Sequence, residues 1–212
     1  KIKRIVDIST QDADMIMRNR VRKTGSLSSG MRSSYKSLSP EKQKEEMEKS
    51  VSGSYKNPIK LQAVSFKGLD QLVDSVEYDY ECVIKNELIE VGDLRMFRIP
   101  YGDAIATIDN FSAETRKFPL EYWRYEDVEE YETVVNIKIP SGKKIAEVPA
   151  DQTFTFNKST YSLKFVKNGP DKLTVIRKAK MNRENVLPSQ YAEMKNFLNN
   201  IIKAESKYIA FK

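Results

Sequence analysis

Histidine does not occur in this 212-residue sequence, and cysteine occurs once, as Cys82. The usual general base of serine and cysteine hydrolases is therefore absent, as is the commonest ligand of catalytic zinc. In its alternating segment Cys82 has the same parity as Val76, Tyr78 and Ile84. We therefore expect Cys82 to face the interior as a small hydrophobic side chain rather than to act as a nucleophile. We expect no enzyme activity, no catalytic residue, and no cofactor or metal.

Two other kinds of catalysis need no histidine, namely carboxylate pairs of the glycosidase type and a Ser-Lys dyad. The acidic residues, however, fall mainly in patterns such as Glu126-Asp127-Val128-Glu129-Glu130, which are typical of an exposed strand or turn. The eight glycines are scattered singly and indicate turns, because a phosphate-binding loop would need them grouped. A carboxylate hydrolase remains the least favoured of the functions considered.

Aromatic side chains cluster at Tyr122, Trp123, Tyr125 and Tyr131. Aromatic faces stack on sugar rings and on cations, so this cluster is a candidate ligand-binding site. In an extended strand Trp123 and Tyr125 share one face and Tyr122 lies on the other. Trp123 and Tyr125 are thus the candidate binding residues, and the alternative is that the half facing inward belongs to the core.

The net charge of +6 is unevenly distributed along the chain. Residues 1–60 carry +7, residues 61–150 carry −8, and residues 151–212 carry +7. A basic beginning and end can complement an acidic middle within one fold, leaving no single strong field for a polyanion. We therefore expect no nucleic-acid partner, since no basic stripe interleaved with aromatic residues is present.

Hydrophobic residues make up 40% of the chain and charged residues 31%, a balance typical of a globular protein with a real core. No apolar run is long enough to span a bilayer, so we expect no membrane insertion. The sequence opens with Lys1-Ile2-Lys3-Arg4, without an initiator Met or the pattern of a signal peptide. This start is expected of a segment excised from a longer polypeptide, and equally of a processed mature terminus.

Alternation and turn residues predict many short strands. They predict a hairpin over residues 2–8 and 13–23, and further strands over 59–66, 76–85, 91–99, 120–125, 131–139, 144–148, 152–157, 160–167, 172–180 and 208–211. Two abutting helices, or one helix with a break near Pro40, are predicted between residues 27 and 51, because Ser39-Pro40-Glu41 is a helix-start signal. A broad apolar stripe predicts a last helix over residues 189–203, which covers one face of a sheet.

These elements predict a mainly β or α+β fold. We expect antiparallel, sandwich-like sheets with an N-terminal helical segment and a C-terminal covering helix. Two lobes are predicted. Residues 1–119 would form a β-rich lobe that contains the inserted helices, and residues 120–212 a sandwich-like lobe that ends in the covering helix and the last strand.

The order of these features resembles the region that follows the catalytic core in bacterial transglutaminase-like proteins, whose flanking domains are known only as domains of unknown function. The resemblance covers nearly the whole chain and rests on the basic strand Met15–Lys23, the segments Arg116-Lys117-Phe118-Pro119 and Ile137-Lys138-Ile139-Pro140-Ser141-Gly142, the helix Tyr191–Ile202 and the strand Tyr208–Phe211. The Cys-His-Asp triad of that core has no counterpart here, so no catalytic residue is carried over.

The resemblance implies an exported protein of the periplasm or cell envelope. Within it, this chain would be a non-catalytic accessory or structural domain whose partner is the catalytic core of the same polypeptide. The alternative is a cell-envelope module that binds a glycan or peptide through Trp123 and Tyr125.

Overall fold

The computed structural model describes residues 1–212 except 54, 56, 58, 108–110, 112 and 122–127. The strands in this part of the chain are β1 (Ile2–Gln11), β2 (Asp14–Thr24), β3 (Ile59–Lys67), β4 (Ser75–Ile84), β5 (Ile89–Val91), β6 (Leu94–Arg98), β7 (Leu120–Glu121), β8 (Glu130–Lys138), β9 (Ile145–Glu147), β10 (Gln152–Phe156), β11 (Ser159–Lys167), β12 (Lys172–Lys180), β13 (Asn185–Val186) and β14 (Tyr208–Phe211). The helices are α1 (Ser26–Tyr35), α2 (Pro40–Ser52), η3 (Pro188–Gln190) and α3 (Tyr191–Glu205).

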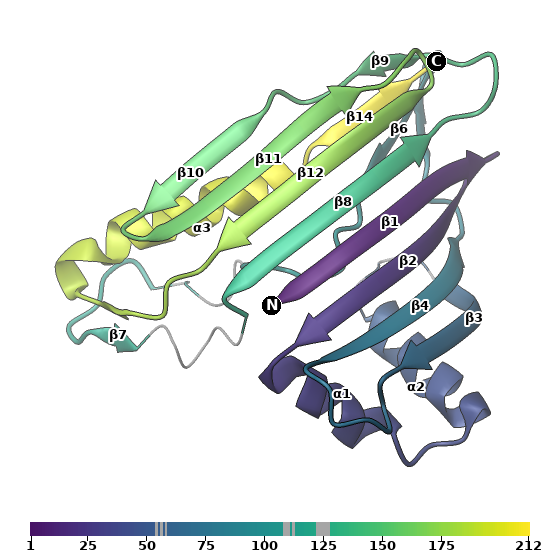
Figure 1. Cartoon of the computed structure of the whole chain (residues 1–212). Coiled ribbons are helices and arrows are strands. Elements are labelled where there is room, and N and C mark those ends of the chain that lie inside the picture. The colour runs from purple at the N-terminus through teal and green to yellow at the C-terminus, as the bar shows by residue number, and fades with distance from the viewer. Residues whose placement is uncertain (54, 56, 58, 108–110, 112, 122–127) are drawn as a thin grey trace.

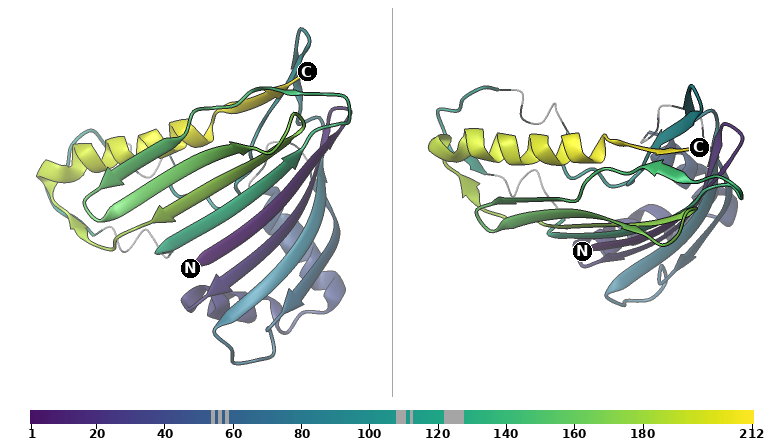
Figure 2. Two further views of the ribbon diagram at one scale, coloured as in Figure 1. Left: turned by 45° about the horizontal axis from the view of Figure 1, so that its top comes forward. Right: turned by 90° about the horizontal axis from the view of Figure 1, so that it is seen from above.

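A large eight-stranded sheet dominates the molecule, with the strand order β10-β11-β12-β8-β1-β2-β4-β3 (Figure 1). Its neighbouring strands are antiparallel except β1 and β8, which pair in parallel over Ile2–Ser9. Alternate side chains of the central strands are buried on one face only. The helices lie against that face, and the opposite face, called here the open face, has no element over it in the described part of the chain (Figure 2).

The first two strands form the predicted hairpin. β1 and β2 pair antiparallel along their full length, from Ile2 opposite Lys23 to Gln11 opposite Asp14. Asp12 has a φ of 52° in the turn between them, a conformation that aspartate adopts more readily than most residues. Alternation in the sequence also indicates which side chains of the hairpin face the core, and Val6, Met15 and Met17 are completely buried.

The two predicted helices follow the hairpin. Ser39 caps α2 by accepting a hydrogen bond from the Lys42 backbone N–H at 3.4 Å, and Pro40 occupies the first helical position. Met47 is the one fully buried side chain of α2, so this helix is mostly solvated, as its composition predicts. It packs against the edge strand β3.

The C-terminal segment also matches its prediction. α3 buries Tyr191, Met194, Phe197, Leu198 and Ile201 and covers the end of the large sheet formed by β10, β11 and β12 (Figure 2). β14 then enters a four-stranded sheet of order β5-β6-β14-β9, and a separate pair joins β7 to β13. The core lies between the large sheet on one side and the helices and the small sheet on the other.

The mainly β, α+β class with antiparallel-rich sheets and a C-terminal helix is therefore confirmed. The strand predicted over residues 91–99 corresponds to β6, which starts later, at Leu94, because Gly92 takes a φ of 62° and turns the chain between β5 and β6. Strands from both sides of residue 119 share the large sheet, and the division into two lobes stays a prediction. None of the helices in the described ranges has the length and apolarity of a membrane span.

Candidate functional site

The candidate site lies on the open face of the large sheet. A row of aliphatic side chains, Ile5, Val134 and Ile176, runs across its three neighbouring central strands β1, β8 and β12. Ile5 is 39% exposed although its strand is central. Charged and polar side chains surround this row, so the face has an apolar centre and a polar rim.

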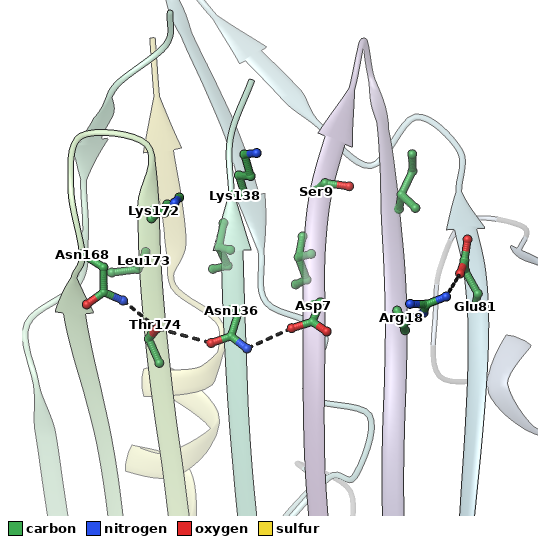
Figure 3. Close-up of a pocket in the computed structure, with 13 residues that line it drawn as sticks. Asp7, Ser9, Arg18, Glu81, Asn136, Lys138, Asn168, Lys172, Leu173 and Thr174 are labelled. Atoms are coloured by element: carbon green, nitrogen blue, oxygen red, sulfur yellow. Dashed lines mark hydrogen bonds and ion pairs between the residues drawn. The ribbon is translucent and has the colours of Figure 1, made fainter. Parts of the chain in front are cut away.

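A shallow depression of about 630 Å³ lies on the open face, towards the ends of β1, β8, β12 and β2 (Figure 3). A chain of hydrogen bonds runs along it across three strands. Asn168 Nδ2 donates to Thr174 Oγ1 at 2.8 Å, Thr174 Oγ1 donates to Asn136 Oδ1 at 3.3 Å, and Asn136 Nδ2 donates to Asp7 Oδ1 at 2.9 Å. These hydrogen bonds fix the orientation of the four side chains, because each one is bonded to at least one of the others.

Two ion pairs lie beyond Asp7, on the side of β2 and β4. Arg20 Nη2 binds Asp7 Oδ2 at 2.9 Å, and Arg18 Nη2 binds Glu81 Oε2 at 3.3 Å. The four side chains are between 32% and 66% exposed, so water and salt screen these pairs and each stabilises the fold by no more than about 1 kcal/mol. Their main effect is to neutralise this part of the face.

Two lysines, Lys138 and Lys172, differ from their neighbours in the depression. Both line its upper end, and within the described residues neither ammonium group has an ion pair or a hydrogen bond (Figure 3). They leave this end of the depression with uncompensated positive charge. The arrangement can bind an acidic or hydrogen-bonding surface. Its two carboxylates, Asp7 and Glu81, are each paired with an arginine, Arg20 and Arg18 respectively.

Sequence reasoning missed this depression. Alternation alone does place Asp7, Asn136 and Thr174 on the outward faces of their strands. The parallel pairing of β1 with β8 is what brings them together, and it joins segments about 130 residues apart. No local pattern in the sequence encodes such a pairing.

The two predicted binding residues, Trp123 and Tyr125, lie outside the described residues, as does Tyr122. Tyr131, the fourth member of the aromatic cluster, is buried in the core on β8. The described residues of the open face include no aromatic side chain. Ligand binding by Trp123 and Tyr125 therefore stays a prediction, separate from the depression.

A second group of polar residues lies inside the molecule, around the buried guanidinium group of Arg4. Arg4 Nε and Nη2 bind Asp103 Oδ2 at 2.9 and 2.8 Å, and Arg4 Nη1 donates to Asn19 Oδ1 and to the Tyr80 hydroxyl. Burial, the largest single influence, would lower the pKa of Arg4, but Asp103 together with Tyr80 and Tyr78 raises it. Gly102 permits this approach, because a Cβ there would lie 2.9 Å from Arg4 Cζ.

Arg177 is the other buried arginine, and it is completely inaccessible. Its Nε donates to Glu205 Oε1 at 2.6 Å and its Nη2 donates to the Asp103 carbonyl oxygen at 2.8 Å. The guanidinium carbon lies 5.0 Å from the ring centre of Tyr101 and 5.6 Å from that of Tyr131. Burial raises the pKa of the Glu205 carboxyl, and Arg177 opposes that rise. This network connects the sheet, segment 101–103 and α3.

Cys82 is fully buried in β4, as its parity predicts. Burial raises the pKa of its thiol to about 12, and the nearby Glu81 adds to the rise. Thiolate is the reactive form of cysteine, so this side chain is inert at neutral pH. Among the described residues, no three Cys, Asp or Glu side chains are grouped as the ligands of a metal ion would be.

The fold and its surfaces define an α+β protein with one uncovered sheet face. Residues 96–211 match the family described as a domain of unknown function with a solved structure, DUF3858, and the chain belongs to this family. A crystal structure of a protein from Parabacteroides distasonis, described as a putative protease, is similar at a TM-score of 0.43 and 16% identity. The match covers 57% of this chain and 24% of that protein, so this chain spans a small part of its length. No curated protein matches the sequence.

Proposed function

We propose that this chain is a non-catalytic accessory domain of a larger exported transglutaminase-like protein of the periplasm or cell envelope. Its open face would contact the catalytic core of the same polypeptide. The observation that carries the proposal is the uncovered face itself, with its aliphatic row Ile5, Val134 and Ile176 inside a charged rim. Interfaces between proteins and between domains commonly have an apolar centre and a polar rim.

Two further observations support this function. The family match places more than half of the chain in a domain family that has no assigned activity of its own. The proposed partner follows from the family resemblance. The region after a transglutaminase-like core is resembled by the segments Met15–Lys23, Ile137–Gly142 and Tyr191–Ile202, so that core is the proposed partner.

The test uses the full-length parent polypeptide with and without this domain. We expect deletion to lower the unfolding temperature of the core, its turnover, or both. Within the domain, reversing the charge of the two unpartnered lysines (Lys138→Glu with Lys172→Glu) should lower the unfolding temperature of the core by about 2–4 °C, the effect of losing ~1 kcal/mol of interface. Neither lysine has a partner among the described residues, so the domain itself should fold normally.

The matched control reverses two exposed lysines on the helix side of the molecule, Lys36→Glu with Lys207→Glu, and should leave the core unchanged. An unchanged core after deletion of the whole domain would refute the proposal. The alternative function, a glycan- or peptide-binding module, would instead be supported if the isolated domain bound envelope glycans and Trp123→Ala abolished that binding.

A further inference from the structure

A small cavity of about 80 Å³ lies between the C-terminal turn of α2 and the inner face of the large sheet. Its polar lining comes from Arg4, Lys23, Ser50, Tyr55, Tyr78, Tyr80 and Asp103. On this measure a water molecule needs only about 10–15 Å³, so the space can hold water or one small ion. This cavity is separate from the open face and from the function proposed for it.

The charges around the cavity do not balance. Arg4 and Lys23 each carry a positive charge, and Asp103 is the one carboxylate in the lining. Asp103 binds Arg4, while the ammonium group of Lys23 has no ion pair in the described part of the chain. Lys23 Nζ instead lies over the Tyr78 ring, 5.9 Å from its centre. Burial lowers the pKa of Lys23, because an ammonium group without a bound counter-ion is less stable when it is partly removed from water.

One hydrogen-bond donor in the lining has no well-formed partner. The Tyr55 hydroxyl oxygen is inaccessible and makes no hydrogen bond of ordinary distance and angle among the described residues. The pKa of Tyr55 is raised, by burial first and also by the neighbouring Tyr80 hydroxyl, which already accepts a hydrogen bond from Arg4. Buried polar groups are almost always paired with protein, water or an ion, so the Tyr55 hydroxyl indicates an occupant that accepts hydrogen bonds.

We propose that this cavity binds one small monovalent anion of the size of chloride or nitrate. The ammonium group of Lys23 and the Tyr55 hydroxyl would hold it, and it would neutralise the one excess positive charge that Arg4 and Lys23 leave beside Asp103. The small volume favours an anion of a few atoms over sugars and phosphate esters.

The proposal is tested by thermal unfolding of the full chain at constant ionic strength, replacing sodium gluconate, a much bulkier anion, by chloride or nitrate. The unfolding temperature of the unmodified protein should rise by about 3 °C near saturation, as expected of a ligand that binds only the folded state. Lys23→Met should remove this rise. Lys67→Met, which removes an exposed lysine of the open face, should keep it.

Tyr55→Phe provides a second variant that keeps both charges and the ring, and it should weaken the rise at least several-fold. Binding is followed independently by the broadening of the ³⁵Cl NMR line, which should be large for the unmodified protein and small for Lys23→Met. An equal rise for Lys23→Met and the unmodified protein would show a general salt effect and overturn the proposal. An absent rise with both anions would show a cavity that holds water, and would overturn it as well.

Discussion

Arg4 and Arg177 lie on strands β1 and β12, and both guanidinium groups bind the same residue of an irregular segment. Arg4 binds the side chain of Asp103 and Arg177 binds its backbone carbonyl. A buried cation is costly unless it is paired and hydrogen-bonded, so each arginine depends on its acceptors. The two residues thereby hold segment 101–103 against the inner face of the sheet.

Glu205→Gln should be among the most destabilising single changes in the chain. The substitution keeps the size of the side chain but removes the carboxylate that lies 2.6 Å from the inaccessible Arg177. Removing one partner of a buried ion pair leaves an uncompensated charge, which costs about 3–5 kcal/mol. We expect a loss near ~3 kcal/mol in the free energy of unfolding, measured by urea denaturation, because the Glu205 side chain keeps 17% exposure.

Glu193→Gln is the matched control, since Glu193 is exposed on the same helix, and it should change the free energy of unfolding by at most about 0.5 kcal/mol. The double variant Arg177→Met with Glu205→Gln should be more stable than Glu205→Gln alone, because the uncompensated cation is gone. A double variant less stable than Glu205→Gln would show that the stacking of Arg177 on Tyr101 and Tyr131 matters more than its charge pairing.

At the scale of elements, the outer strand β3 is protected from pairing with another chain. Its register shifts between Leu61 and Ala63, which interrupts the regular edge. Helix α2 covers part of it, and its Glu48 Oε2 accepts a hydrogen bond from the Leu61 backbone N–H at 2.8 Å. Lys44 Nζ donates to the Gln62 carbonyl oxygen at 3.2 Å. Bulges and charged side chains at an edge are common means of preventing aggregation.

Glu48→Ala should therefore expose the edge of β3. The Leu61 N–H loses its acceptor, and the free energy of unfolding should fall by about 1–2 kcal/mol. Light scattering at increasing concentration should also detect association that the unmodified chain lacks, because a free N–H is now available to another strand. Glu46→Ala, on the same helix with an exposed i,i+3 pair to Lys49, should do neither. Equal association of both variants would contradict the protective role of Glu48.

The sequence predicted the elements better than their assembly. Strong alternation located β1, β2, β4, β8, β11 and β12, and the cap at Ser39 located the start of α2, because these signals are local. Alternation puts Arg4 on the same face of β1 as Ile2 and Val6, but nothing local indicates that Asp103 binds it. The depression could not be predicted, since it depends on contacts between β1 and β8 across about 130 residues.

At the scale of the whole molecule, the N-terminal part completes the sheet to which the family domain belongs. The family match begins at residue 96, and the segment before it contributes β1 to β5. β8 lies in the match and pairs with β12 on one side and with β1 on the other. Without β1, a long central strand would become an unprotected edge, and Asp103 would lose the guanidinium group of Arg4.

A chain of residues 96–212 alone should therefore fail to fold as a stable monomer. β8 would expose the backbone groups that pair with Ile2–Ser9, and its buried side chains Val135 and Ile137 would lose their β1 neighbours. We expect a broad thermal transition and elution as oligomers in size-exclusion chromatography, whereas residues 1–212 should unfold cooperatively as a monomer. Co-expression of residues 1–95 as a separate chain supplies the missing strands and should restore a one-to-one complex. A monomeric 96–212 fragment with a sharp transition near that of the full chain would show that the family domain is autonomous, and that the shared sheet joins two independent units.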